Sequence, residues 1–170
     1  MDETTLSLEP PLRACWMKVG QQKRIPATQM GGKQRWHLFG GYNWSKDTIT
    51  WTTAVTKNTA TFIAFLEELL VQRYSTGRVV LVMDNVSYHK SAAALAALSL
   101  FEHRVAVIWL PPYCSDLNPI ERFWRFLKDT ACANRLQACI QDVITSAVGV
   151  LSRQNDPTSI HRFHVSKDLR

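Results

Sequence analysis

The stretch "RVVLVMDN" at residues 78–85 is a continuous apolar run that ends on an aspartate, Asp84. Such a run predicts a strand buried on both faces, usually in a parallel pairing. The stretch "RVAVIWLPP" at residues 104–112 predicts a second buried strand, which stops at two prolines. Between them, Ser91 can cap an alanine-rich helix that begins "AAALAALSLF". Together these segments predict a β-α-β unit.

The residues upstream predict a hairpin and a helix. Residues 35–44 and 47–56 are rich in Thr, Trp, Val and Ile and are separated by a short polar turn. Residues 58–75 place large apolar side chains at helical spacing, with Asn58 or Thr59 as the expected N-cap. The first 30 residues are predicted to be irregular, with room for one further strand around "QQKRIPA".

The residues downstream predict a helix that starts at a stiff loop. In "LPPYCSDLNPIERFW", Asn118 is the expected N-cap and Pro119 takes the first helical position, which favours proline. Helical character continues, with breaks, to about Arg153. The chain therefore predicts an α/β domain over residues 1–153, a mixed sheet flanked by helices, followed by a polar, basic tail over residues 154–170.

Composition narrows the class of protein. The chain has 170 residues, 46% hydrophobic and 20% charged, as in a soluble globular domain. It shows no signal peptide and no apolar run near 18 residues, so we expect no membrane contact. The net charge of +6 favours a polyanionic partner without proving one. The four cysteines form no CxxC pair and are interpreted as reduced, mostly buried thiols of a cytosolic protein rather than zinc ligands.

Two carboxylates stand where chemistry is expected. Asp84 follows a buried strand, at the sheet edge where α/β proteins bind ligands, although it could simply end the strand or cap the next helix. Glu121 stands three residues after Asn118, which also fits a capping box. In a β-α-β-α arrangement both can reach one sheet edge, where they would suit a hard cation such as Mg²⁺.

A third acid would let the site hold two ions, which together clamp the attacking and leaving oxygens of a phosphodiester. The N-terminal "MDE" offers Asp2 or Glu3, and spacing alone does not choose between them.

Other polar residues lie near these acids in the sequence. Asn85, His89 and Lys90 follow Asp84, although His89 also fits an ordinary surface loop. Basic residues recur along the last predicted helix, where they could meet DNA phosphates or simply face solvent: Arg122, Arg125 and Lys128.

Three stretches now point to a family. "MDNVSYHKS" at residues 83–91, "LPPYCSDLNPIERFWRFLK" at residues 110–128 and the N-terminal "MDETTLSLEPPLRACWMKVGQQKRIP" closely resemble the DDE transposases of bacterial insertion sequences related to mariner. The resemblance runs from Asp2 to about residue 150. Its most specific part is the block from Leu-Pro-Pro-Tyr to Asn-Pro-Ile-Glu.

This resemblance implies a ribonuclease H-like fold and a catalytic, metal-binding triad of Asp2, Asp84 and Glu121. Glu3 matches the family's neighbouring glutamate, and Asn85, His89 and Asn118 are expected to support the site. Lys90 and the basic residues of the last helix are expected to bind DNA.

The chemistry that the resemblance implies is phosphoryl transfer on DNA with two Mg²⁺ ions, for which Mn²⁺ substitutes. Water cuts the strand at the insertion-sequence ends, and the freed 3′-hydroxyl attacks a TA-containing target. The resemblance also implies a dimer or larger assembly on paired terminal repeats, in the bacterial cytoplasm and at the nucleoid when DNA is bound.

The sequence departs from the family pattern in three places. Cys114 and Ser115 stand where relatives often have Ser-Pro. The central first strand is expected to precede Asp2, so the chain looks truncated inside it. No helix-turn-helix segment precedes the domain, and an upstream reading frame would have to supply one. A second hypothesis is therefore a truncated, inactive remnant that binds DNA or transposase subunits without cutting. A junction resolvase is disfavoured by the Leu-Pro-Pro-Tyr block.

Overall fold

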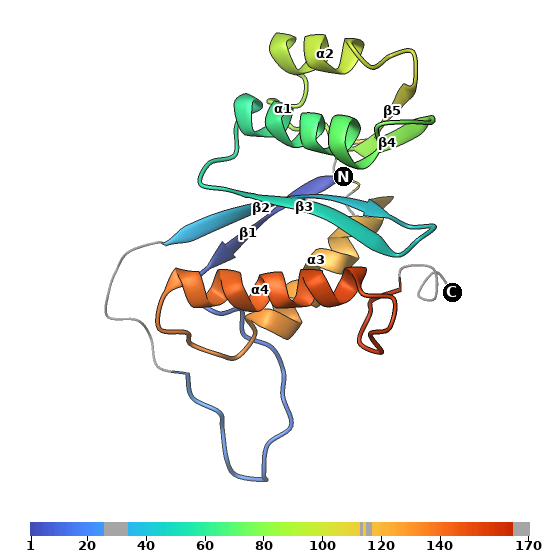
Figure 1. Cartoon of the computed structure of the whole chain (residues 1–170). Helices are drawn as coiled ribbons and strands as arrows, with labels where there is room; N and C mark the ends of the chain where they lie inside the picture. The colour runs from blue at the N-terminus through green and yellow to red at the C-terminus, as the bar shows by residue number, and fades with distance from the viewer. Residues whose placement is uncertain (26–33, 113, 115–116, 165–170) are drawn as a thin grey trace.

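A computed structural model gives the fold of the chain over residues 1–25, 34–112, 114 and 117–164. The predicted order of hairpin, helix, strand, helix, strand and helix is present, with one more strand in front of it (Figure 1). In chain order the elements are β1 (Asp2–Ser7), β2 (Arg35–Asn43), β3 (Thr48–Ala54), α1 (Thr59–Glu67), η1 (Glu68–Arg73), β4 (Val79–Met83), α2 (Ala92–Ser99), β5 (Val105–Trp109), α3 (Pro119–Ala131) and α4 (Ile140–Asn155).

The first sheet is antiparallel, with strand order β1-β2-β3. β2 and β3 form the predicted hairpin, and Asp47 in its turn has a positive φ of 50°. β1 corrects the prediction of an irregular N-terminus, since Asp2 pairs with Gly40 and Leu6 pairs with Trp36 of β2. We expected the first strand to end near Asp2, but it begins there. In "QQKRIPA", residues 21–25 form no strand, and residues 26 and 27 lie outside the described residues.

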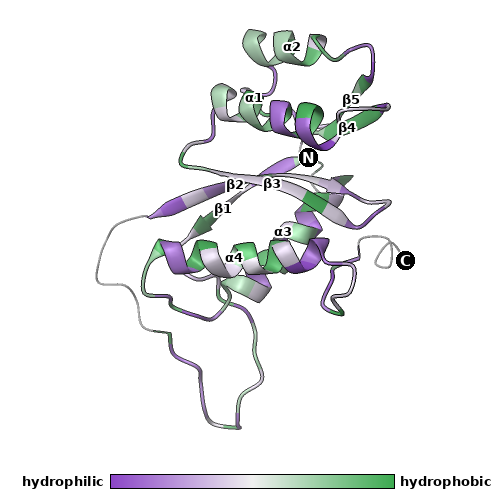
Figure 2. Ribbon diagram, viewed as in Figure 1, coloured by the Kyte–Doolittle hydropathy of each residue, from purple (hydrophilic) through white to green (hydrophobic). Residues whose placement is uncertain are grey.

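The second sheet consists of β4 and β5, which pair in parallel as predicted. The single mixed sheet that we expected is therefore two sheets in this structure. They meet where the amino group of Met1 donates a hydrogen bond to the Val82 carbonyl oxygen. The prediction that both strands are buried on both faces is wrong, because Val80 is 60% exposed and Ile108 is 53% exposed. The opposite face packs in the core with α1 and α2, through Leu81, Met83 and Val105. Figure 2 shows the apolar character of both strands.

Capping side chains fix where the first two helices begin. The Asn58 side chain accepts a hydrogen bond from the Thr61 amide, and the Thr61 hydroxyl oxygen accepts one from the Asn58 amide, which makes a capping box. The single helix predicted to follow changes to a π-helical turn, η1, in its second half. Arg104 donates hydrogen bonds to the carbonyl oxygens of Leu70 and Tyr74, which would otherwise lack partners at the C-terminal end of η1. Ser91 caps α2 as predicted.

Helices pack on both faces of the three-stranded sheet. Figure 1 shows α3 and α4 on one face and α1 on the other. The α3 and α4 side buries a core that includes Leu6, Leu38, Trp124, Leu127 and Leu151. The α1 side buries a second core that includes Phe39, Phe62, Phe65, Leu81 and Met83 and continues under β4, β5 and α2. The sheet is thus held in place from both sides at the point where β1 begins.

The C-terminal residues that are described also pack on the domain. α4 continues to Asn155, and Phe163 stacks on Phe126 with ring centroids 5.3 Å apart. His164 lies 2.7 Å from the Asp47 carboxylate. The domain boundary at residue 153 stays a prediction.

Two predictions about composition can be checked on the described residues. None of the helices described is long and apolar enough to cross a membrane. The interpretation of the cysteines as mostly buried is wrong, because Cys15 and Cys139 are exposed and only Cys132 is buried. Cys15 lies in the segment that leaves β1, and Cys139 precedes α4, so neither is drawn into a core.

Candidate active site

Three carboxylates from three different elements line one cavity with a volume of about 350 Å³. Asp2 is the first residue of β1, Asp84 directly follows β4, and Glu121 is the third residue of α3. Asn85 and Asn118 line the same cavity. The structure therefore brings together the three acids that the resemblance selected, at the edge where β4 and β5 end.

Asn118 does not make the capping box that the sequence allowed. It occupies the N-cap position of α3, and its carbonyl oxygen accepts from the Glu121 amide at 3.0 Å, but its side chain caps nothing. Instead, its buried amide donates to the Met1 carbonyl oxygen at 3.2 Å. The start of α3 is thereby held against the start of β1. Reciprocal capping does not account for Glu121, whose carboxylate lines the cavity.

A close approach between α3 and β2 was not predicted. Gly40 pairs with Asp2, and a Cβ atom on Gly40 would lie only 2.5 Å from the Trp124 ring. This space lets α3 lie against the sheet next to Asp2. The Gly-Gly pair inside the predicted strand was the available signal, since glycine in a strand often marks a close contact.

The Asp2 side of the cavity is electrostatically crowded. Asp2 is only 6% exposed. Burial raises the pKa of its carboxyl, the charge of Glu121 raises it further, and the result is a pKa of about 7. Burial disfavours the charged form, and a neighbouring carboxylate does the same. At neutral pH, this part of the cavity is therefore a place where a cation would be stabilising.

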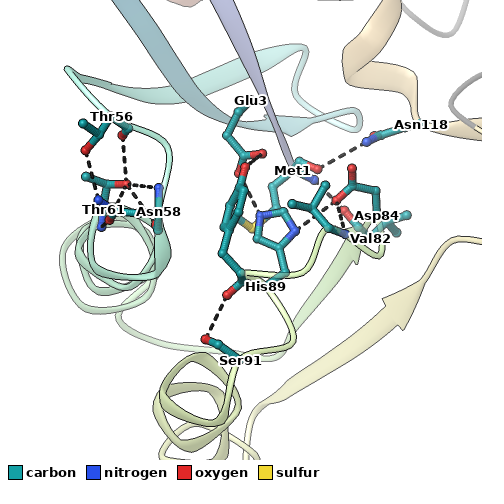
Figure 3. A network of polar contacts seen from close by, with 12 residues as sticks. Met1, Glu3, Thr56, Asn58, Thr61, Val82, Asp84, His89, Ser91 and Asn118 are labelled. Atoms are coloured by element: carbon teal, nitrogen blue, oxygen red, sulfur yellow. Dashed lines mark hydrogen bonds and ion pairs between the residues drawn. The ribbon is translucent and has the colours of Figure 1, made fainter.

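The Asp84 side is supported by a buried histidine. His89 has no exposed side-chain surface, so its interpretation as a surface-loop residue is wrong. Its Nδ1 lies 3.0 Å from Asp84 Oδ1, and its Nε2 lies 2.9 Å from Glu3 Oε1 (Figure 3). Burial alone would lower the pKa of His89, but the two carboxylates outweigh it and raise the pKa to about 9. The contact with His89 holds the pKa of Asp84 below its usual range.

Glu3 and Tyr88 complete this side of the site. Glu3 is buried, and the Tyr88 hydroxyl donates to its Oε2 at 2.8 Å. Burial, and then the negative charge of Glu3, raise the pKa of Tyr88, so this phenol stays a donor. Sequence reasoning missed Tyr88. Its place one residue before His89 carried no signal of this contact.

Of the remaining predicted residues, Asn85 lines the cavity and the basic residues lie outside its lining. The Asn85 side chain donates to the Leu110 carbonyl oxygen and so ties the chain after β4 to the chain after β5. Lys90 is exposed, with its ammonium 4.9 Å from the centre of the Trp109 ring. Arg125 is exposed, whereas Arg122 and Lys128 are half-buried. Burial lowers the pKa of Lys128, and Glu121 and Asp2 act against that shift.

The donor set suits a hard divalent cation, because carboxylate and amide oxygens are the ligands that such ions prefer. Across the parts of the chain that the structure describes, no three His, Cys, Asp or Glu side chains are already grouped closely enough to hold a metal ion. The three acids thus share a cavity without closing around a single point.

Comparisons with known proteins agree on a family. Residues 1–144 match the model of the DDE superfamily endonuclease family. An insertion element IS630 uncharacterized 39 kDa protein from Shigella sonnei is 29% identical over 133 residues, which is 78% of this chain and 38% of that protein. The chain thus spans well under half the length of this relative.

Two similar solved structures bear on the fold. The mariner Mos1 paired end complex with Mg has a TM-score of 0.70 and 17% identity, covering 97% of this chain and 50% of that one. The Mos1 strand transfer complex has a TM-score of 0.67 and 17% identity, covering 88% and 45%. At this identity the likeness concerns the fold alone, and it agrees with the ribonuclease H-like arrangement that the resemblance implied.

Proposed function

Because the chain belongs to the DDE superfamily endonuclease family, we propose that it is the catalytic part of a transposase that cuts DNA at insertion-element ends and joins the freed end to target DNA. The observation that carries this proposal is the convergence of Asp2, Asp84 and Glu121 on one cavity. Three acidic oxygen donors at one place are what metal-assisted phosphoryl transfer requires.

The three carboxylates are proposed as the residues that hold Mg²⁺, with two ions expected. A bound divalent cation would lower the pKa of the attacking water and stabilise negative charge on the phosphate. The raised pKa of Asp2 supports this assignment, because burial and Glu121 create a charge deficit there that a cation would relieve. A bound cation would also draw together the three acids, which line one cavity but are not grouped around one point.

The asparagines are proposed to keep these acids in place. Asn118 holds the start of α3 to the Met1 carbonyl oxygen, next to Asp2. Asn85 holds the segment after Asp84 to Leu110. Asn118 therefore connects the elements that carry Asp2 and Glu121, and Asn85 connects the segment after Asp84 to the chain after β5. Neither asparagine is itself needed as a metal ligand.

DNA is the proposed partner. Lys90 and Arg125 are exposed near the site and, with Arg122 and Lys128, would contact phosphates rather than read bases. The net charge of +6 agrees with a polyanionic partner. The TA target, the assembly on paired ends and the helix-turn-helix segment stay expectations from the resemblance.

The test is nicking of a labelled duplex that carries the element end, with Mg²⁺, by the 170-residue chain and two variants. Asp84→Asn removes a proposed ligand. Asp142→Asn is the matched control, because Asp142 is exposed in the first turn of α4, away from the cavity. We expect Asp84→Asn to nick on the order of 1,000-fold more slowly, since the several kcal/mol that a metal contributes corresponds to this factor. Asp142→Asn should cut like the parent chain.

Equal rates for Asp84→Asn and the parent chain would show that the cut does not depend on this cavity. A parent chain that binds the duplex but does not nick it would overturn the proposal and favour the DNA-binding remnant.

A further inference from the structure

Asp2 and Asp84 lie on strands that are not paired with each other in the part of the chain that the structure describes. Asp2 begins β1 in one sheet, and Asp84 follows β4 in the other. The Met1 amino group makes one backbone contact with β4, at Val82. Within the described residues, side-chain contacts therefore join the regions of the two aspartates in addition to this backbone contact.

A side-chain bridge spans the gap between them. It runs from Glu3, the neighbour of Asp2 on β1, through the His89 ring to Asp84 (Figure 3). Its two contacts are 2.9 Å and 3.0 Å long, and the ring between them is fully buried. The Nε2 contact with Glu3 is a hydrogen bond, whereas the Nδ1 contact with Asp84 is an ion-pair distance without hydrogen-bond alignment.

The bridge is held rigidly from the sides. The Phe62 ring lies 4.2 Å from the His89 ring, centre to centre, and Tyr88 meets its edge at 4.7 Å. Tyr88 also donates its hydroxyl to Glu3, which fixes the far carboxylate. These contacts restrict the ring and keep its Nδ1 at 3.0 Å from Asp84 Oδ1.

The contacts divide the two oxygens of Asp84 between two tasks. His89 Nδ1 and the Val86 amide both approach Oδ1, at 3.0 Å and 3.4 Å. In the proposed arrangement, Oδ2 is the oxygen that would bind a cation. A carboxylate held by one oxygen presents the other in a defined direction, as groups behind metal ligands commonly arrange.

We propose that His89, anchored by Glu3, is a positioning residue that sets the orientation of Asp84 and its distance from Asp2 for cation binding. This inference rests on the proposed function, because it assumes that Asp84 binds a divalent cation. It assigns no chemistry to His89 or Glu3 themselves. Their effect on cleavage passes entirely through the carboxylate that they hold.

Two substitutions separate the two ends of the bridge. The amide nitrogen of asparagine can replace Nδ1, so His89→Asn keeps a donor for Asp84 and loses the contact with Glu3. The amide of glutamine reaches the place of Nε2, so His89→Gln keeps Glu3 and loses Asp84. Mn²⁺ binding to each 170-residue variant is measured by calorimetry at fixed pH, with thermal unfolding as the measure of folding.

We expect His89→Gln to weaken Mn²⁺ binding about 10-fold or more, as loss of an outer-shell partner does, and His89→Asn to weaken it less. In an Asp84→Asn background, His89→Gln should weaken Mn²⁺ binding no further. A purely structural role would lower the melting temperature of both variants and leave their Mn²⁺ affinity unchanged, which would overturn the inference.

If His89→Gln does not fold, Glu3→Gln takes its place, since it weakens the anchor without emptying the core. Unchanged Mn²⁺ affinity in both Glu3→Gln and His89→Asn would overturn the inference. A parent chain that binds no Mn²⁺ and does not nick DNA would refute the proposed function itself, whereas a parent chain that binds Mn²⁺ with unaffected variants refutes the positioning role alone.

Discussion

Asp2 and Asp84 lie on the same cavity, but their surroundings act on them in opposite directions. Asp2 is buried beside Glu121, and its pKa rises to about 7. Asp84 keeps 40% of its side chain exposed and is held by His89, and its pKa falls. One wall of the cavity opposes negative charge, and the other accommodates it.

The difference shows how such a site can be ready for a cation and still fold without one. If Asp84 were also buried beside other carboxylates, repulsion among three ionised groups would destabilise the folded state whenever no cation is bound. His89 supplies a positive charge next to Asp84, so the uncompensated negative charge is confined to Asp2 and Glu121. Functional sites commonly carry a local cost of this kind in stability.

The largest expected effect comes from removing the charge of Asp2. With chelator present at pH 8, Asp2→Asn should stabilise the fold by roughly 2–4 kcal/mol, because a carboxyl whose pKa is raised from 3.8 to about 7 disfavours the folded state when it is ionised. Urea unfolding of the parent chain and the variant measures the difference. A variant that is less stable than the parent would show that Asp2 is not under strain, and the contrast with Asp84 would be lost.

The pH dependence of stability tests the same strain without a substitution. The folded pKa of Asp2, about 7, lies above its unfolded value of 3.8, so the folded state binds the extra proton. Stability in chelator should therefore fall as pH rises, by about 2 kcal/mol between pH 5 and pH 7. Urea midpoints across this range measure the slope. Asp2→Asn should make the slope shallower and leave the smaller fall that His89 contributes, because the pKa of His89 is also raised in the folded state, from 6.5 to about 9. An equally steep slope in that variant would assign the titration to another group.

Asp84→Asn should have a smaller effect of the opposite sign. It weakens the contact with His89 and leaves that buried ring beside a neutral amide. We expect the folded state to lose about 1 kcal/mol in chelator, a value reduced because the Asp84 side chain is partly in solvent. Thermal unfolding beside the Asp142→Asn control measures it. If Asp84→Asn stabilised the fold instead, the Asp84 carboxylate would destabilise the folded state, as the Asp2 carboxylate does.

The sequence predicted the parts of this site that depend on local pattern. β4, β5 and α2 were predicted correctly because their signals are local. These signals are the apolar runs of the two strands, the prolines after β5 and the capping serine before α2. β1 was missed because its threonines and acids make a weak strand pattern, and its structure depends on pairing with β2. The exposed faces of Val80 and Ile108 were missed for a related reason, since burial depends on what packs over a strand.

The electrostatic difference between the two aspartates was beyond the sequence. Convergence of the acids followed from the rule for strand ends and from the family resemblance, but the sign of each pKa shift depends on distant partners. His89 meets Glu3 from 86 positions away along the chain. Asn118 was assigned a cap because the spacing was right, yet its side chain binds the Met1 carbonyl oxygen 117 positions away.

The smallest expected effect separates the two causes of the strain on Asp2. Burial is the larger cause and Glu121 the second, so Glu121→Gln removes only the second. Because Glu121 is half-exposed, its charge is screened, and we expect a stabilisation of about 0.5 kcal/mol in chelator. The slope of stability between pH 5 and pH 7 should remain, shifted to lower pH, since burial still holds the pKa of Asp2 above its unfolded value. If Glu121→Gln instead abolished the slope, the raised pKa of Asp2 would come from repulsion between the two carboxylates. The opposite pKa shifts of Asp2 and Asp84 would then reflect their charged neighbours rather than how deeply each is buried.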